Sequence, residues 1–176
     1  MTLRKKWVLG GVAGPLALVA GVVMFVALQD ARKKTYQTRC VHNLKFISMA
    51  LSQYAKDNDG SYPNSLSALY PEYLPDLDAF VCPQLRVPFE SERGTQHPFA
   101  PGPKPEEIDS LGSYALVPGL SANGDKDTVV AYEKEDNHSG RGRSLLYLDG
   151  RGAWEPPENW RDGPPNVNLP VELKKP

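Results

Sequence analysis

The sequence has little of several things, and each shortage excludes a class of protein. Only 2 cysteines and 3 histidines occur in 176 residues, which excludes a domain built on several disulfides or on paired Cys-x-x-Cys zinc motifs. The net charge is -1, so there is no basic excess and we expect no nucleic-acid partner. Charge is also absent from one long run, Trp7–Leu28.

This charge-free run, WVLGGVAGPLALVAGVVMFVAL, predicts a transmembrane helix, because about 20 apolar residues cross the roughly 30 Å hydrocarbon core of a bilayer. A cleaved signal peptide is the alternative, but the run is longer than usual and no small-x-small cleavage site follows it. We therefore expect an uncleaved single-pass anchor, with residues 1–6 on the cytoplasmic side and the following domain outside. Gly10 and Gly14 form a GxxxG pattern that could pack against another helix.

A second helical pattern follows the charge-free run. Apolar residues recur three or four positions apart with polar residues between them, which predicts an amphipathic helix with one buried stripe. The stripe consists of Val41, Leu44, Ile47, Leu51 and Tyr54. Because neither Gly nor Pro separates it from the first segment, we expect one continuous helix of about 50 residues. Gly60 is suited to end it as a left-handed cap.

The C-terminal half of the chain has the pattern of short strands. Ser113–Leu120, Asp127–Lys134 and Arg143–Asp149 are β-branched or aromatic runs bounded by turn residues. The Asp-Gly pair after the third run predicts a hairpin to a fourth strand, Arg151–Glu155. The fold class is therefore α+β, with a long N-terminal helix, part transmembrane and part amphipathic, packed on a small sheet of three or four antiparallel strands.

Three other segments complete the organisation. Asn64–Leu74 is expected to form a short helix, and the proline-rich segment Glu90–Asp109 to be irregular. Residues 156–176 form a proline-rich tail after a domain that spans 29–155.

The two cysteines, Cys40 and Cys82, have two interpretations. In an exported domain an even pair favours a disulfide, which would tie the amphipathic helix to a mid-chain loop and contribute about 3–4 kcal/mol. Two buried thiols are the alternative. We expect no zinc site, because the histidines and cysteines show no paired ligand spacing in the sequence.

Three segments together resemble the type IV pilin-like and type II secretion pseudopilin-like proteins, above all those of planctomycete-type bacteria. The segments are RCVHNLKFISMALSQYAKDNDGSYPNSL, FVCP and NHSGRGRSLLYLDGRGAWE. In the last, the resemblance implies a structural role for His138, Gly140, Asp149, Gly150 and Trp154. The usual prepilin start, a Gly-Phe-Thr-Leu-x-Glu sequence, is absent, and the apolar run contains no glutamate.

The resemblance implies a structural protein and not an enzyme. It would be a pilin-like assembly component of a secretion or pilus apparatus, anchored in a bacterial inner membrane, with its domain in the periplasm. Its partners would be the lipid bilayer and other membrane or pilin-like proteins, bound through the N-terminal helix. The alternative is a non-polymerising accessory or binding subunit of another envelope complex. We expect no cofactor, although pseudopilins suggest calcium as an alternative, with Ser121, Asp125 and Asp127 as candidate ligands. The same residues are equally typical of a solvated β-turn.

Overall fold

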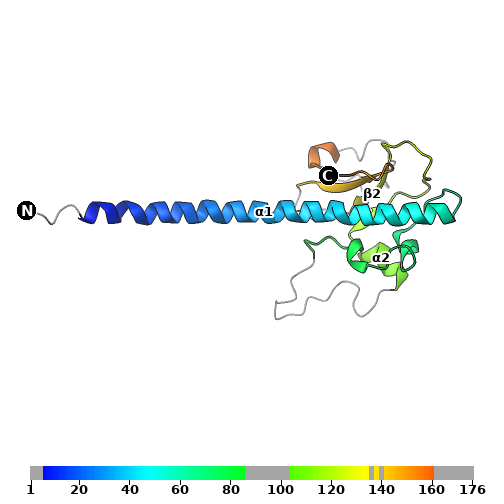
Figure 1. Cartoon of the computed structure of the whole chain (residues 1–176), viewed down its shortest axis with the longest axis horizontal. Helices are drawn as coiled ribbons and strands as arrows, with labels where there is room; N and C mark the ends of the chain where they lie inside the picture. Colours follow the sequence, from blue (N-terminus) through cyan, green and yellow to red (C-terminus); the bar gives the residue numbers. More distant parts are fainter. Residues whose placement is uncertain (1–5, 86–103, 135–136, 139–140, 161–176) are drawn as a thin grey trace, which may run out of the picture. The chain divides into compact units, whose positions relative to one another are not determined.

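A computed structural model of the chain describes residues 6–85, 104–134, 137–138 and 141–160 (Figure 1). The chain divides into two compact units, Met1–Thr35 and Tyr36–Pro176. Helix α1 (Lys6–Asp57) contains 52 residues, begins in the first unit and ends in the second. One continuous helix of about this length was expected because no helix breaker separates the charge-free run from the amphipathic stripe, and the expectation is confirmed.

The membrane prediction is wrong. Among the described residues, no helix combines the length and the apolar character needed to cross a bilayer. In the part of α1 whose side chains the structure describes, the apolar residues end at Leu28 and are followed by the polar residues Gln29, Asp30 and Arg32. The expected transmembrane half, the inner-membrane location and the periplasmic side of the domain are therefore not retained. Gly14 has no neighbouring atom within 4 Å of its Cβ position, and Gly10 is described only by its place in α1.

The C-terminal part of α1 carries the expected buried stripe. Leu44, Ile47 and Leu51 are at most 1% exposed, whereas Val41 and Tyr54 are half-buried. Along the described side chains, Cys40 is the first buried residue. The helix ends at Asp57, and Gly60 caps it as predicted: its positive φ of 81° permits a return hydrogen bond from its N–H to the carbonyl of Ala55 (2.8 Å).

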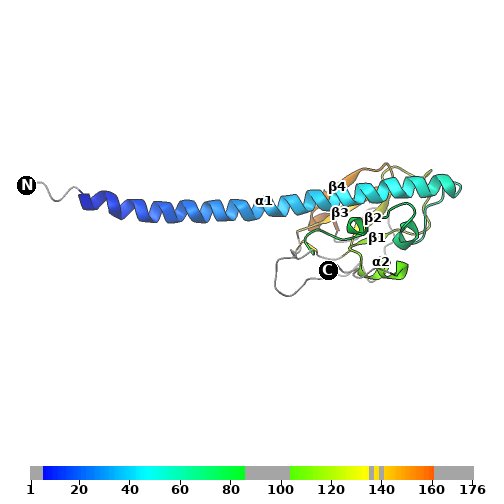
Figure 2. The ribbon, with the colours of Figure 1, turned by 60° about the horizontal axis from the view of Figure 1, so that its bottom comes forward.

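Four antiparallel strands form one sheet in the order β1-β2-β3-β4. They are β1 (Tyr114–Leu116), β2 (Val129–Glu133), β3 (Arg143–Tyr147) and β4 (Gly152–Glu155). All four strands were predicted, including the hairpin between β3 and β4, where Gly150 has a φ of 81°. In Figure 2 the strands lie beside the C-terminal part of α1, drawn in cyan.

The sheet has apolar contacts on both faces. One cluster joins the stripe of α1 to Val130, Ala131 and Leu146 of the sheet. A second, smaller cluster contains Val129, Tyr132 and Leu145. The register between β2 and β3 shifts between Val129 and Ala131, so the simple alternation of faces is interrupted there. Ala131 belongs to the cluster that contains the stripe of α1. From Ala131 to the end of β2, every second side chain therefore faces α1.

The connecting segments depart from the sequence predictions. Asn64–Leu74 contains only a short 3-10 helix, η1 (Leu66–Leu69), whose first N–H groups donate to the carboxylate of Asp109 (2.8 and 3.3 Å). That aspartate lies in helix α2 (Pro105–Leu111), within a segment predicted to be irregular, so this prediction is wrong. Two further 3-10 helices are η2 (Leu77–Phe80) and η3 (Pro157–Trp160). Residues 1–5, 86–103 and 161–176 lie outside the described residues, as does Gly140.

Candidate functional site

The end of strand β2 places a carboxylate inside the domain. Side chains two residues apart on a strand face the same side, so Glu133 faces the α1 side with Ala131. Glu133 is 0% exposed. Its carboxylate accepts hydrogen bonds from the Asn137 side-chain amide (3.0 Å) and the Ser144 backbone N–H (3.3 Å). A buried carboxylate is costly to keep ionised unless such partners and a positive charge accompany it.

Both cysteines lie close to the Glu133 carboxylate. Cys40 comes from α1 and Cys82 from the segment after η2, and both are 0% exposed. Their Sγ atoms lie 3.0 Å apart, and both are free thiols in this structure. The backbone N–H of Cys82 donates to Ser113 Oγ (2.7 Å), and the Asn43 side chain donates to the Val81 carbonyl (3.0 Å). These two contacts fix Cys82 against the helix. The predicted disulfide itself stays a prediction.

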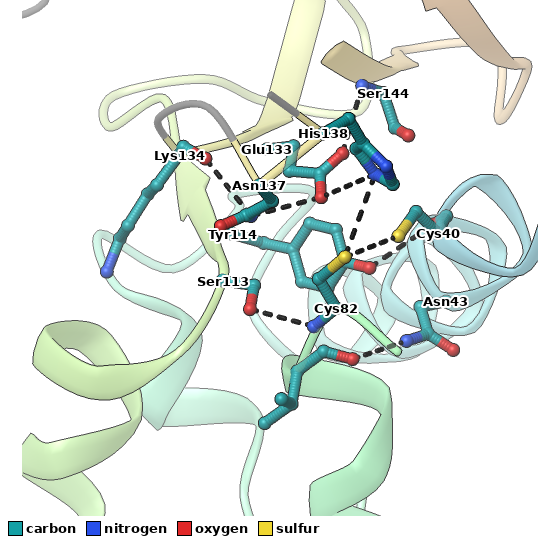
Figure 3. Close-up of polar contacts among 11 residues, drawn as sticks. Cys40, Asn43, Cys82, Ser113, Tyr114, Glu133, Lys134, Asn137, His138 and Ser144 are labelled. Atoms are coloured by element: carbon teal, nitrogen blue, oxygen red, sulfur yellow. Dashed lines mark hydrogen bonds and ion pairs between the residues drawn. The ribbon is translucent and has the colours of Figure 1, made fainter. Parts of the chain in front are cut away.

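His138 lies beside Cys82 and Glu133. Its Nε2 lies 3.7 Å from Cys82 Sγ and 3.2 Å from Glu133 Oε1, and the residue is 4% exposed. The imidazole packs edge-on against the Trp154 indole, with ring centroids 4.7 Å apart. Figure 3 shows the side chains of Cys40, Cys82, Glu133 and His138 pointing toward one another from separate parts of the chain. We call these four residues the buried cluster.

The charges in the buried cluster depend on one another. Hydrogen bonds with the Cys40 thiol and with His138 lower the pKa of Cys82 to about 7 despite burial. The same thiol–thiol hydrogen bond, together with burial, raises the pKa of Cys40. Burial alone would lower the pKa of His138, but its contacts with Cys82 and Glu133 raise it to about 9. Burial would raise the pKa of Glu133, yet the hydrogen bond and positive charge of His138 lower it overall.

The buried cluster has the composition of a metal site. One ligand atom from each of its four residues lies within 4.8 Å of the others, and it is the one such group of His, Cys, Asp and Glu side chains in the described part of the chain. Two sulfurs, an imidazole nitrogen and a carboxylate oxygen are all groups that bind transition metals. The sequence shows no paired spacing of cysteines and histidines, but the fold brings both cysteines and one of the three histidines together, so the residues could hold a metal ion.

The calcium candidates have other partners. Asp127 accepts a hydrogen bond from Arg151 Nη2 (2.7 Å), and Asp125 accepts one from the backbone N–H of Asp127 (3.0 Å). Ser121 forms an isolated β-bridge with Ser61. The two aspartates stabilise a turn and neutralise an arginine, so the structure gives no specific support to calcium at these residues.

The closing segment NHSGRGRSLLYLDGRGAWE has several roles. Asp149 and Gly150 form the turn between β3 and β4, and Trp154 packs on His138. Gly142 has a φ of 134°, and a Cβ there would lie 2.3 Å from the Glu155 carbonyl oxygen. His138, which the resemblance placed among structural residues, belongs to the buried cluster. Glu133 was not singled out from the sequence.

A surface pocket in the described part of the chain does not include the buried cluster. It measures about 310 Å³, and its lining includes Arg39, His42, Phe46 and Asp76. None of the four cluster residues lines this pocket. Comparison with models of protein families, with characterised proteins and with solved structures gives no match for the chain.

Proposed function

We propose that this chain is a pilin-like structural protein that assembles through the N-terminal part of α1. The observation that carries the proposal is the exposure of apolar side chains in this part of the helix. Their exposed fractions run from 51% at Leu28 to 71% at Leu18. The others are Val19, Val22, Val23, Met24, Phe25 and Val26. Exposed apolar surface of this extent indicates a surface that other molecules cover.

The positions of these side chains indicate the kind of partner. Consecutive residues of a helix point about 100° apart, so Val22 to Val26 cover the whole circumference and not one stripe. A globular partner on one side would cover only part of it, whereas several parallel helices would cover all of it. Gly14 and Gly21 lie seven residues apart, on one face, and neither has an atom within 4 Å of its Cβ position. Both therefore permit close approach by another helix.

The second unit supports the same proposal. A helix packed on a small antiparallel sheet is the architecture that the resemblance to pilin-like proteins implies. The buried cluster is at most 4% exposed and does not line the surface pocket, which favours a structural role over a catalytic one. The partners we propose are further copies of this chain or other pilin-like subunits, each contributing an equivalent helix.

Two matched substitutions test the proposal. Leu18 and Met49 both lie on α1 and are 71% and 69% exposed, but only Leu18 lies in the exposed apolar run. Sedimentation and electron microscopy of the full chain should show large helical assemblies that Leu18→Asp abolishes and Met49→Asp leaves intact. A wild-type chain that stays monomeric at high concentration would contradict the proposal. Discrete complexes of fixed size would favour the non-polymerising accessory subunit instead.

A further inference from the structure

We propose that Cys40, Cys82, Glu133 and His138 bind one zinc ion, which fastens helix α1 to the sheet. The inference is independent of the proposed assembly function, since it concerns only the second unit. It begins from the fact that all four side chains are buried and converge on one point (Figure 3). The four residues come from α1, the segment after η2, the end of β2 and the turn that follows it.

The spacing of the ligand atoms fits a tetrahedral ion. With Zn–S bonds of about 2.3 Å and Zn–N or Zn–O bonds of about 2.0–2.1 Å, two sulfurs are roughly 3.7 Å apart, and nitrogen and oxygen roughly 3.4 Å apart. The corresponding distances in the cluster are 3.0 Å between Cys40 and Cys82, and 3.2 Å between His138 and Glu133. The Cys82–His138 distance is 3.7 Å. Zinc would require the sulfurs to separate by about 0.7 Å, a change within reach of cysteine side-chain rotation.

The donor set favours zinc over other common ions. Calcium and magnesium prefer oxygen ligands, of which the cluster supplies only the Glu133 carboxylate. Two thiolates with one imidazole and one carboxylate in a closed arrangement are typical donors for Zn²⁺. Because the protein supplies all four ligands and they are at most 4% exposed, no position is left for a substrate. The ion would therefore be structural.

A disulfide between Cys40 and Cys82 explains less of the geometry. It would use the two sulfurs and leave Glu133 and His138 as a separate buried pair beside it. Burying a carboxylate and an imidazole carries a desolvation cost that a disulfide does not require. A metal site uses all four side chains. Asn137, which donates to Glu133 Oε1 (3.0 Å), would then position the carboxylate toward the ion.

The test uses the full chain, purified with reductant, freed of metal by a chelator and then titrated with Zn²⁺. We expect one ion per chain by elemental analysis. Titration with Co²⁺ in place of Zn²⁺ should give the visible bands of a tetrahedral ion and a sulfur-to-metal charge-transfer band with the intensity of two thiolates. The cobalt spectrum reports ligand number in the wild-type chain, so the proposal stays testable even if a variant does not fold.

Variants assign the ligands. Cys40→Ser, Cys82→Ser and His138→Gln should each weaken Zn²⁺ binding by more than about 100-fold, and Asn137→Ala, a positioning residue, by about 10–100-fold. His42→Gln is the control, because His42 is exposed on the same helix. Binding should be unchanged in it. The proposal is overturned if the folded, reduced chain takes up no stoichiometric Zn²⁺, or if the cysteine variants bind like the control. A Cys40–Cys82 disulfide in protein isolated from its native cells would also overturn it.

Discussion

Replacing Glu133 by glutamine isolates the buried contact between this carboxylate and His138. Glutamine preserves the shape of the side chain, so no cavity forms. The substitution removes a charge-assisted hydrogen bond to His138, which contributes about 1.5–3 kcal/mol. Glu133 uses both of its oxygens as acceptors, one for Asn137 and one for the Ser144 N–H, whereas glutamine has only one acceptor oxygen. The lost hydrogen bond costs about 1 kcal/mol more. In chelated, reduced protein we therefore expect a loss of about 3 kcal/mol at pH 6.

This loss should depend on pH in a defined direction. The pKa of His138 in the folded protein is about 9, above its ordinary value of 6.5. A group whose pKa rises on folding contributes its full stabilisation below the unfolded value and loses it as the pH rises through the folded value. The difference between wild type and Glu133→Gln should therefore be complete below about pH 6.5. It should shrink toward about 1 kcal/mol as the pH rises through about 9, where the histidine loses its proton.

Urea unfolding followed by circular dichroism measures the difference at pH 6 and above about pH 9. Both proteins carry the same thiols, so titration of the cysteines affects both curves. Glu72→Gln is the matched control, because Glu72 is exposed and its substitution should change the free energy of unfolding by less than about 0.5 kcal/mol at either pH. A difference that is independent of pH, or one as small as that of the control, would refute the proposed charge pairing of Glu133 and His138.

Three further pairs of substitutions test the core, one glycine position and the caps of two 3-10 helices. Ile47→Ala should lower the free energy of unfolding in urea by about 3 kcal/mol, because Ile47 is 0% exposed in the main core. Met49→Ala should change the same free energy by less than about 0.5 kcal/mol, because Met49 is exposed. Gly142→Ala should lower the melting temperature, because its positive φ and the nearby Glu155 carbonyl leave no room for a Cβ, whereas Gly21→Ala should not lower it. Asp109→Ala should lower the free energy of unfolding by about 1 kcal/mol, because it removes the acceptor of two N–H groups at the start of η1. Asp76→Ala is the comparison, because it removes the acceptor of only one N–H group, in η2.

Local patterns predicted the regular elements well. The stripe of α1 was recognised because helical spacing repeats over several turns, and the hairpin of β3 and β4 because Asp-Gly has few alternatives to a tight turn. Helix α2 was missed because proline and charge dominate its surroundings, and its seven residues are too few to show a period. The membrane prediction rested on the composition of a run, and the described helix does not bear it out.

The buried cluster could not be predicted in the same way. Long stretches of chain separate Cys40, Cys82 and the neighbouring pair Glu133 and His138, and only the pairing of β2 with its neighbours and the packing of α1 bring them together. Glu133 gave one weak signal, an acid at the end of an otherwise apolar strand. Such an acid faces solvent or the core according to which side of the sheet its side chain lies on. Counting alternate residues along β2 does not give that side, because the register shifts between Val129 and Ala131.

The position of Cys40 has a mechanical consequence. Along the described side chains it is the first buried residue, so tension applied to the N-terminal part of α1 enters the second unit there. A helix held only by apolar contacts can slide along a sheet under shear, because each contact is replaced by a similar one. A sulfur fixed at the entry point resists the first step of such sliding and distributes the force to strand β2 and to the segment after η2. In the assembly that we propose, tension on the N-terminal part of α1 would therefore reach the second unit at the buried cluster.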